Sequence, residues 1–277
     1  MISKPVEHNG RGLFIFGCGY VGTHLARRAL EKGMTVWGTS RDGEARRRLT
    51  SLGIKAIDPV DAAAMAEAAM MARYILVTAA PDQGGCPGAR AIVPALSQGD
   101  GWPDWIGYLS STAVYGDRNG GWVFEGDRLN AATLEGARRV RAEAEWLEIG
   151  QGMGLCVQAF RLPGIYGPDR SALDRVRAGT ARRVIKPGQV FNRIHIEDLV
   201  SGLEASMARP SPGRIYNLSD DEPCAAHILT EWAAQALGVD QPAVVEWTDP
   251  SVSESMRRFY LDSKRVSNAR AKAELGW

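Results

Sequence analysis

From Leu13 onward, short apolar runs alternate with segments whose apolar residues recur at helical spacing. Such runs predict buried strands, and the 3.6-residue period predicts helices that pack on them. The sequence therefore predicts βαβ units and a parallel sheet covered on both faces. The expected strands are 13–17, 34–40, 55–59, 74–81 and 105–111, and the expected helices are 23–33, 45–53, 62–72 and 134–147.

The alternation loosens after Arg161, where a loop-rich stretch is followed by helical segments without matching strands. This change predicts a smaller second lobe rather than a second independent domain. The expected fold is α/β, a doubly wound parallel (Rossmann) sheet with a small C-terminal substrate lobe. A flexible N-terminus of 1–11 is expected before a Rossmann domain of 12–165 plus 190–218, and the lobe is expected to comprise 166–189 plus 219–277.

Composition narrows the class of partner. The formal net charge of +1 supplies no global field that would draw the chain to nucleic acid or to an acidic membrane. No 18-residue apolar run occurs, and the first residues contain no apolar segment of a signal peptide. The four cysteines are far apart, which argues against a disulfide framework or zinc site. We therefore expect a cytoplasmic protein with a small-molecule substrate, no nucleic-acid or membrane partner and no metal.

The sequence GCGYVG places Gly17, Gly19 and Gly22 in the order G-x-G-x-x-G. The match gains specificity because it follows a predicted strand and opens a predicted helix. In this context the first glycine permits a tight turn, the second lets the backbone approach a pyrophosphate, and the third allows close packing of helix and strand. The pyrophosphate is expected at the helix N-terminus. The loop therefore predicts a dinucleotide site.

The end of the second strand distinguishes between two cofactors. An NAD site usually has an acidic residue here, which accepts a hydrogen bond from the ribose 2′-hydroxyl. This chain has Thr39, Ser40 and Arg41 at that place, with Asp42 just beyond. A guanidinium suits a 2′-phosphate because its planar fork binds two oxygens at once. NADP is therefore favoured over NAD, although an inward-turned Asp42 would reverse the preference.

Several segments in the same order resemble the short-chain dehydrogenase/reductase superfamily, and most closely its extended and atypical branches of NAD(P)-dependent nucleotide-sugar epimerases and dehydratases. They are GCGYVG, SSTAVYGD, FRLPGIYGP, FNRIHIEDLVSGL, IYNLSDDEP and the closing KRVSNARAKAELGW. Together they span nearly the whole chain. The resemblance implies a homodimer and an NAD(P) cofactor. The implied cofactor contacts are Gly17, Gly19, Tyr20, Val21, Gly22, Ser40, Arg41, Ala79, Arg139 and Pro163.

In that superfamily the chemistry depends on a Ser or Thr, a Tyr and a Lys. Here the resemblance assigns the strand-end hydroxyl to Ser111, with Thr112 as the adjacent alternative. The usual helix motif Y-G-x-x-K-x-x-x-E places Glu135 where Tyr belongs and Arg139 where Lys belongs. The expected active site therefore keeps its hydroxyl but lacks the usual proton donor.

Two interpretations of the substituted pair remain open. Arg139 is cationic and can keep part of the lysine's role toward the nicotinamide ribose. Glu135 needs a raised pKa to replace a tyrosine, whereas a nearby arginine lowers it. The i,i+4 spacing of the two residues also fits an ordinary surface ion pair. Tyr115, which ends the strand near the expected nicotinamide, is the other candidate acid.

The expected substrate residues lie in the second lobe. The segment 175–189 is basic, and its interpretation as a clamp for a phosphorylated or nucleotide-linked substrate competes with that of a solvated basic face. Tyr166, Asn192 and Arg193 are expected to face the same cleft. The candidates from the basic segment are Arg182, Arg183 and Lys186.

Two functions are consistent with these patterns. The first is an NADP-dependent oxidoreductase or epimerase of the epimerase/dehydratase type, which acts on a sugar-like or nucleotide-sugar substrate with a non-standard acid or base. The second is a catalytically silent NADP-binding sensor or protein-interaction partner. The intact glycine loop and strand-end hydroxyl favour the first function, and the missing Tyr and Lys favour the second.

Overall fold

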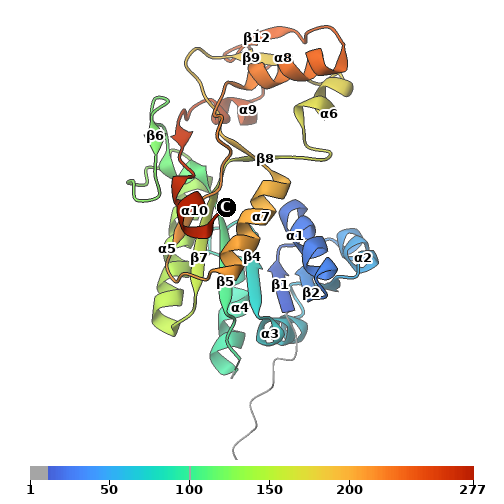
Figure 1. Cartoon of the computed structure of the whole chain (residues 1–277), viewed down its shortest axis with the longest axis vertical. Helices are drawn as coiled ribbons and strands as arrows, with labels where there is room; N and C mark the ends of the chain where they lie inside the picture. Colours follow the sequence, from blue (N-terminus) through green and yellow to red (C-terminus); the bar gives the residue numbers. More distant parts are fainter. Residues whose placement is uncertain (1–11, 100) are drawn as a thin grey trace, which may run out of the picture.

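The computed structural model describes residues 12–99 and 101–277, so the expectation for 1–11 lies outside the described residues. Seven parallel strands form one sheet in the order β11-β7-β5-β4-β1-β2-β3 (Figure 1). This is the doubly wound α/β sheet that the sequence predicts. Its strands are β1 (Gly12–Phe16), β2 (Thr35–Thr39), β3 (Lys55–Ile57), β4 (Tyr74–Val77), β5 (Trp105–Ser111), β7 (Val157–Leu162) and β11 (Ile215–Asn217).

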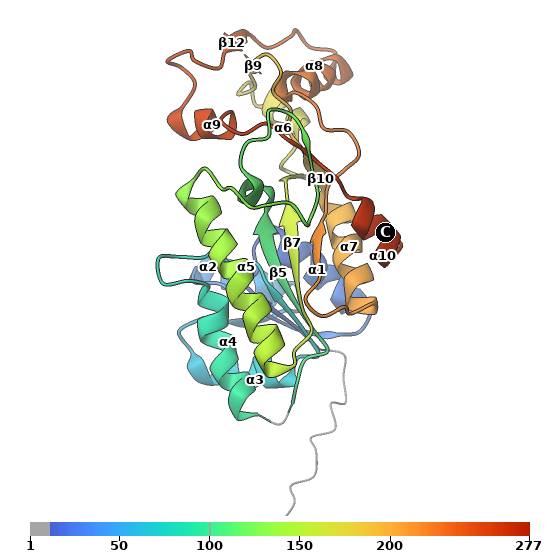
Figure 2. The same ribbon diagram turned by 90° about the vertical axis from the view of Figure 1, so that its left-hand side faces the viewer.

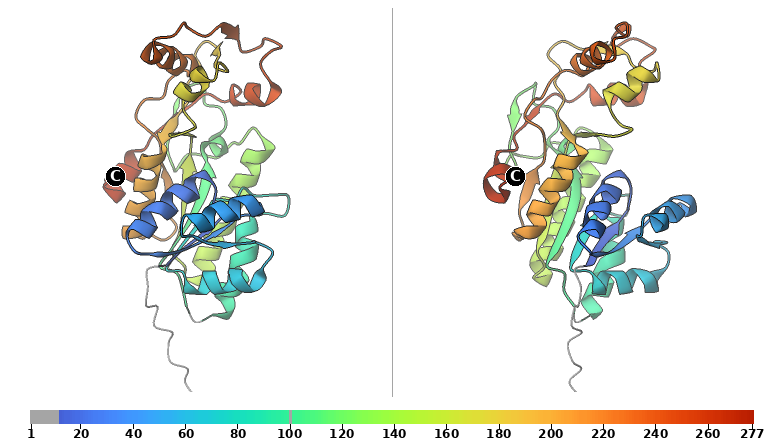
Figure 3. Two further views of the ribbon diagram at one scale, coloured as in Figure 1. Left: turned by 90° about the vertical axis from the view of Figure 1, so that its right-hand side faces the viewer. Right: turned by 45° about the vertical axis from the view of Figure 1, so that its right-hand side comes forward.

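Helices bury both faces of the sheet. Along β5, Trp105 and Leu109 enter the core beneath one helical layer, whereas Ile106 and Tyr108 enter the core beneath the other. Figure 3 shows the helices α1 and α7 side by side on the first face. That face carries α1 (Tyr20–Glu31), α2 (Gly43–Ser51) and α7 (Ile196–Ala208), and the opposite face carries α3 (Ala62–Met71), α4 (Pro87–Gln98) and α5 (Leu134–Met153).

Two helices differ from the sequence expectation. The pattern analysis does not predict α4, whose interior contains Pro94, a residue that usually breaks a helix. The helix forms nevertheless, since its buried Ile92 and Leu96 pack on the sheet and Pro87 stands in the first turn, where its missing N–H is not needed. Helix α5 extends beyond residue 147 and ends at Gly154, which adopts φ +69°.

The smaller lobe contains short strands in pairs and three helices (upper part of Figure 1). A small core of Val184, Val252 and Tyr260 holds it together. Strand β8 (Gly164–Tyr166) pairs with β10 (Arg193–His195), and β9 (Arg183–Ile185) pairs with β12 (Val244–Glu246). The helices of the lobe are α6 (Ala172–Arg177), α8 (Ala226–Leu237) and α9 (Glu254–Phe259).

The end of the chain returns to the sheet. Strand β13 (Arg265–Val266) pairs with β6 (Trp122–Val123), and α10 (Ala269–Leu275) packs against α7. Ala271 and Leu275 on one face of α10 are buried in the core on that side of the sheet. The expected assignment of all of 219–277 to the smaller lobe is therefore wrong for α10. The remaining domain boundaries stay a prediction.

Three further observations concern membrane-spanning helices, metal sites and disulfides. No helix within residues 12–99 and 101–277 has both the length and the apolar character needed to cross a bilayer. Within the same residues, no group of three or more His, Cys, Asp or Glu side chains is arranged to hold a metal ion. The cysteines Cys18, Cys86, Cys156 and Cys224 are all free thiols.

A buried ion pair lies near the carboxyl ends of β5 and β7. Arg161 of β7 contacts Glu143 of α5 with Nη2 and Oε2 2.8 Å apart, and each side chain is only 3% exposed. The hydroxyl of Ser110 on β5 donates to the same carboxylate. Arg161 Nη1 donates to Tyr115 Oη and to the Glu125 carbonyl, both at 3.0 Å. The ion pair therefore links strands β5 and β7 to helix α5, to the segment that carries Tyr115 and to the loop that follows β6.

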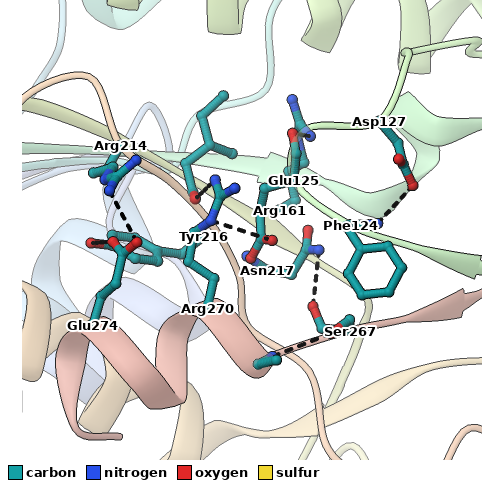
Figure 4. Close-up of polar contacts among 12 residues, drawn as sticks. Phe124, Glu125, Asp127, Arg161, Arg214, Tyr216, Asn217, Ser267, Arg270 and Glu274 are labelled. Atoms are coloured by element: carbon teal, nitrogen blue, oxygen red, sulfur yellow. Dashed lines mark hydrogen bonds and ion pairs between the residues drawn. The ribbon is translucent and has the colours of Figure 1, made fainter.

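Figure 4 shows the continuation of this network toward the end of the chain. The Asn217 amide N–H donates to Glu125 Oε1 (3.0 Å), and its side-chain nitrogen donates to the Ser267 carbonyl (3.0 Å). Arg270 of α10 lies 3.7 Å from Glu125 Oε2. The network thus ties edge strand β11 and the last helix to the loop that follows β6.

We predict that Arg161→Met destabilises the fold by about 3–5 kcal/mol, because the substitution leaves the Glu143 carboxylate buried without its partner. The double variant Arg161→Met/Glu143→Met is expected to lose less stability than Arg161→Met alone. Urea unfolding measures both. Arg214→Met removes an exposed pair with Glu274 (3.1 Å) and is the control, with an expected loss below about 1 kcal/mol. Equal losses for Arg161→Met and Arg214→Met would contradict the prediction.

Candidate functional site

The glycine loop joins β1 to α1 at the point where the strand order reverses, since α1 and α4 cover opposite faces of the sheet. Gly17 has φ +90°, and a Cβ atom there would lie 2.9 Å from the backbone nitrogen of Ala79. A Cβ atom at Gly22 would lie 2.8 Å from Ile15 Cγ2. The turn and the helix packing therefore require glycine at both positions.

Gly19 has no such structural constraint. A Cβ atom at this position would meet only the Gly17 carbonyl oxygen, at 4.0 Å, so the space above the loop is open. Within the described residues, no side chain caps the N-terminus of α1, and its first turn contains no acidic residue. Tyr20 and Val21 follow directly as the first helical residues. Their amides and the helix dipole favour an anion.

These features together test whether the residues fit a dinucleotide. Gly19 leaves the space, the N-terminus of α1 offers donors, and Ala79 lies against the loop with its amide bonded to the Phe16 carbonyl (3.3 Å). Pro163, which follows β7 directly, is half-buried. The residues that the sequence assigns to the pyrophosphate therefore fit that group.

Arg41 and Asp42 follow the end of β2. Asp42 accepts from the amides of Glu44 and Ala45 as the N-cap of α2, so its carboxylate is committed to that helix. Arg41 is exposed, and its side chain has no hydrogen bond or ion pair to any described residue. Ser40 accepts from the Asp42 amide at 3.2 Å.

A second guanidinium stands at the same strand end. Arg46 of α2 donates to the carbonyls of Ser40 (2.7 Å) and Arg41 (3.0 Å), and pairs with Asp58 (2.9 Å). The sequence analysis missed Arg46. Arg46 lies one turn after the Asp42 cap, and this spacing directs its side chain back toward the strand. That spacing is the sequence signal by which Arg46 could have been found.

The strand-end hydroxyls differ in access. Ser111 caps the short 3₁₀ helix η1 (Thr112–Tyr115), where its Oγ accepts from the Ala113 amide at 3.2 Å, and it is half-buried. Thr112 is 9% exposed. Ser111 is therefore the more accessible of the two at the carboxyl end of β5.

Tyr115 lies inside the protein. Its side chain is fully buried, its hydroxyl donates to Asn217 Oδ1 (2.7 Å), and it accepts from Arg161 (3.0 Å). Burial raises the pKa of this phenol. A proton donor must reach its substrate, so this packing disfavours the expected role of Tyr115 as acid.

Glu135 and Arg139, the two candidate residues on α5, lie in different surroundings. Glu135 is exposed in the first turn of the helix, whereas Arg139 is half-buried and donates to the Leu109 carbonyl of β5 at 2.8 Å. The described residues show no ion pair between them, although the i,i+4 spacing permits one. Arg139 thus lies across the end of β5, close to where Ser111 is presented.

The second lobe contains a cavity of about 550 Å³. Tyr166 lines it, packs edge-on against His195 (centroids 5.2 Å apart), and has its pKa raised by burial. Arg193 also lines it, but its Nη1 already donates to the carbonyls of Phe191 and Cys224, both at 3.3 Å. The cavity has three arginines in its wall: Arg170, Arg175 and Arg193.

The other predicted substrate residues serve the protein's own structure. Asn192 donates to the Lys264 carbonyl (2.9 Å) and accepts from the Val266 amide (2.8 Å), which anchors β13. Arg183 pairs with Glu231 at 3.2 Å.

Lys186 and Arg182 also lie outside the cavity wall. Lys186 donates to the Tyr260 carbonyl and lies 4.9 Å from the Trp247 ring centroid. Arg182 lines a separate cavity of about 900 Å³. The structure therefore does not bring Arg182, Arg183 and Lys186 together with Tyr166, although Arg175 at the start of the basic segment lines the same cavity.

Asp220, which the sequence analysis missed, adjoins this wall just after β11. Its amide donates to the Arg193 carbonyl at 2.7 Å, and its buried Oδ1 has no hydrogen-bond partner among the described residues. Burial raises its pKa to about 6, against the opposing effect of the Arg193 charge. Two adjacent acids at a strand end in SDDEP were the sequence signal.

Comparison with known proteins finds solved structures with the same fold. No protein-family model matches the sequence, and no curated protein sequence matches it. A functionally unknown conserved protein from Silicibacter pomeroyi is 37% identical; the alignment covers 97% of this chain and 93% of that chain, with a TM-score of 0.85.

More distant structures share the fold at lower identity. The dTDP-glucose 4,6-dehydratase of Streptomyces venezuelae, solved with NAD bound, is 18% identical with a TM-score of 0.77, over 96% of this chain and 91% of that one. MoeE5, solved with UDP-glucose and NAD, is 18% identical with a TM-score of 0.76, over 96% and 92%. The fold is that of NAD-dependent epimerase/dehydratase structures.

We predict that Asp220→Asn raises the melting temperature at pH 8 but not at pH 4. The folded-state pKa of about 6 lies above the ordinary 3.8, so ionisation of Asp220 lowers stability as the pH rises between these values, and the amide removes that loss. Asp221→Asn is the control. The Lys272 ammonium lowers the pKa of Asp221. Replacing the Asp221 carboxylate by an amide is therefore expected to lower stability at pH 8 or leave it unchanged. An identical shift for Asp220→Asn at both pH values would contradict the prediction.

Proposed function

The chain belongs to the same family as the Silicibacter pomeroyi protein of unknown function, and from this premise we propose that it is a nicotinamide-dinucleotide-dependent enzyme of the epimerase/dehydratase type. The observation that carries the proposal is the glycine loop. Gly17 and Gly22 are required by packing, but Gly19 faces open space beside the uncapped N-terminus of α1. A purely structural turn needs neither the open face nor the free amides.

The preferred cofactor in this proposal is NADP. Asp42 caps α2 and therefore does not accept from a ribose hydroxyl, while Arg41 is exposed and unpaired among the described residues. Arg46 at the same strand end is already paired with Asp58 (2.9 Å), so Arg41 is the guanidinium that remains for a ligand. A 2′-phosphate suits a guanidinium, whereas the Asp42 carboxylate that would bond with a 2′-hydroxyl is committed to the cap of α2.

The proposed substrate is sugar-like and phosphorylated or nucleotide-linked. The cavity of about 550 Å³ has a size suited to a small molecule, and its wall includes Tyr166, Arg175 and Arg193. Arginines in such a wall select an anionic group because they donate paired hydrogen bonds. The S. venezuelae dehydratase acts on dTDP-glucose, and MoeE5 was solved with UDP-glucose, which agrees with this class.

In the proposed mechanism each residue has one task. The glycine loop and the N-terminus of α1 would hold the dinucleotide, whose nicotinamide would supply hydride transfer to or from a substrate carbon. Ser111 orients the substrate oxygen from the end of β5, and Arg139 stabilises negative charge on that side of the site. Glu135 is the proposed acid or base, because a substrate can reach its exposed side chain in the first turn of α5, whereas Tyr115 is buried.

One observation favours the alternative of a catalytically silent NADP sensor. The positions that hold Tyr and Lys in the resembled superfamily carry Glu135 and Arg139, and these two side chains do not contact each other among the described ion pairs. Binding of the cofactor without turnover separates the sensor from the enzyme.

The deciding experiment measures NADPH and NADH binding to the purified protein by calorimetry. The NADPH complex is then incubated with pooled nucleotide-sugars and simple carbonyl compounds, while nicotinamide absorbance and product masses are followed. Tight binding with oxidation or isomerisation supports the enzyme. Tight binding with neither supports the sensor, and no binding of either dinucleotide refutes both.

We predict that Arg41→Ala weakens NADPH binding by about tenfold or more, the effect of one charge-assisted hydrogen bond, and changes NADH binding by less than about twofold. Calorimetric titration measures both affinities. Arg27→Ala on the exposed face of α1 removes the same charge and is the control, with no expected preference between the cofactors. Equal weakening of NADPH and NADH by Arg41→Ala would rule out the 2′-phosphate contact.

If the protein turns over a substrate, Ser111→Ala is expected to lower kcat by about two orders of magnitude, the scale for a positioned donor in an active site. Cofactor affinity is expected to stay unchanged, because Ser111 lies at the end of β5 and not on the glycine loop. Ser97→Ala on the exposed side of α4 is the control. An unchanged rate would remove Ser111 from the mechanism.

A further inference from the structure

Tyr20, the first residue of α1, is in contact with a loop from the second lobe. The guanidinium carbon of Arg170 lies 4.8 Å from the centroid of the Tyr20 ring. The Tyr20 hydroxyl donates to the Pro168 carbonyl at 3.0 Å. Both the face and the tip of this ring are therefore occupied by the loop that joins β8 to α6. The loop that is proposed to hold the pyrophosphate thus has the second lobe as its neighbour.

The turn that carries Arg170 is closely fitted to the glycine loop. The Arg170 amide donates to the Gly167 carbonyl at 3.0 Å, and Asp169 adopts φ +62°, an uncommon value for a non-glycine residue. A Cβ atom at Gly167 would lie 2.7 Å from Tyr20 Oη and 2.5 Å from Ile196 Cγ2. The backbone of this turn is therefore held against α1 and α7 at a distance that only glycine permits.

Arg170 has no ion-pair partner among residues 12–99 and 101–277, although three acidic residues lie near the Tyr20 ring. Glu197 is paired with His24 (3.4 Å) and Asp174 closes the capping box of α6, whereas the neighbouring Asp169 is exposed to solvent. A free guanidinium thus stands beside a helix N-terminus that has no acidic residue in its first turn. Both fields favour an anion between them.

We propose that Arg170 binds the pyrophosphate of the dinucleotide from the second lobe, on the side opposite the amides of α1. The inference rests on the proposed cofactor binding and adds a residue that the superfamily resemblance does not assign. Stacking on Tyr20 holds the guanidinium plane at the glycine loop, from which it donates two parallel hydrogen bonds to phosphate oxygens. Cofactor binding then links the two lobes through one side chain.

An anionic substrate group is the competing ligand, because Arg170 also lines the cavity of the second lobe. The contact with Tyr20 favours the cofactor, since it draws the side chain toward α1. Arg175 and Arg193 remain in the cavity wall for a substrate anion. The two ligands are separated by binding measurements made with the dinucleotide alone.

The test is calorimetric titration of the full chain with NADPH and with NADH, without substrate. Arg170→Ala is expected to weaken both dinucleotides by the same factor of about ten, since both carry the same pyrophosphate. Arg170→Lys keeps the charge and the stacking but not the paired donors, so an intermediate loss is expected. The loss is expected to shrink at high salt. Arg177→Ala, also exposed in the second lobe, is the matched control, with less than about twofold change.

Each outcome has one meaning. Equal loss for both dinucleotides with Arg170→Ala, and little with Arg177→Ala, supports the inference. Unchanged affinity of Arg170→Ala, or a loss no larger than that of Arg177→Ala, overturns it and leaves the proposed function intact. Failure of the unsubstituted protein to bind either dinucleotide overturns the proposed function and the inference together. Matching melting temperatures for the variants exclude misfolding as a cause.

Discussion

The candidate site lies at the carboxyl ends of the strands, and this edge of the sheet depends on the ion pair of Arg161 and Glu143. Both side chains are almost fully buried, so each charge is tolerated only because the other is present. Through Ser110 the pair holds the end of β5, next to Ser111, and through Tyr115 it holds the end of η1. The Tyr115 hydroxyl, a candidate acid in the sequence analysis, is bonded to Asn217 and Arg161 in this network.

A second constraint governs the opposite side of the site. The glycine loop contacts Ala79 after β4, and the Tyr20 side chain that follows the loop contacts a turn of the second lobe, while Gly19 faces open space. The N-terminus of α1 and the Arg170 guanidinium lie on this side of the loop, and Arg41 follows the end of β2. In the proposed function these positive groups select a polyanion by charge.

The catalytic side is less conventional than the binding side. Arg139 reaches across the end of β5, and Glu135 remains at the surface of the helix start. In the proposed mechanism, the bound substrate covers the exposed Glu135 side chain and excludes water from it. In the proposed function, cofactor recognition and chemistry therefore place different demands on this sequence, and the proposal accounts for the first more completely than for the second.

The sequence by itself determined the layered sheet and the glycine loop, because periodicity and sterically required glycines act over a few neighbouring residues. It also located Ser111 and Arg41 through their place at strand ends. Only the tertiary structure decided that Tyr115 is buried, that Asp42 caps α2, that Asn192 and Arg183 bond within the protein, and that Arg170 meets Tyr20. It also formed α4 despite Pro94. These outcomes depend on contacts between residues far apart in the chain, which local pattern does not encode.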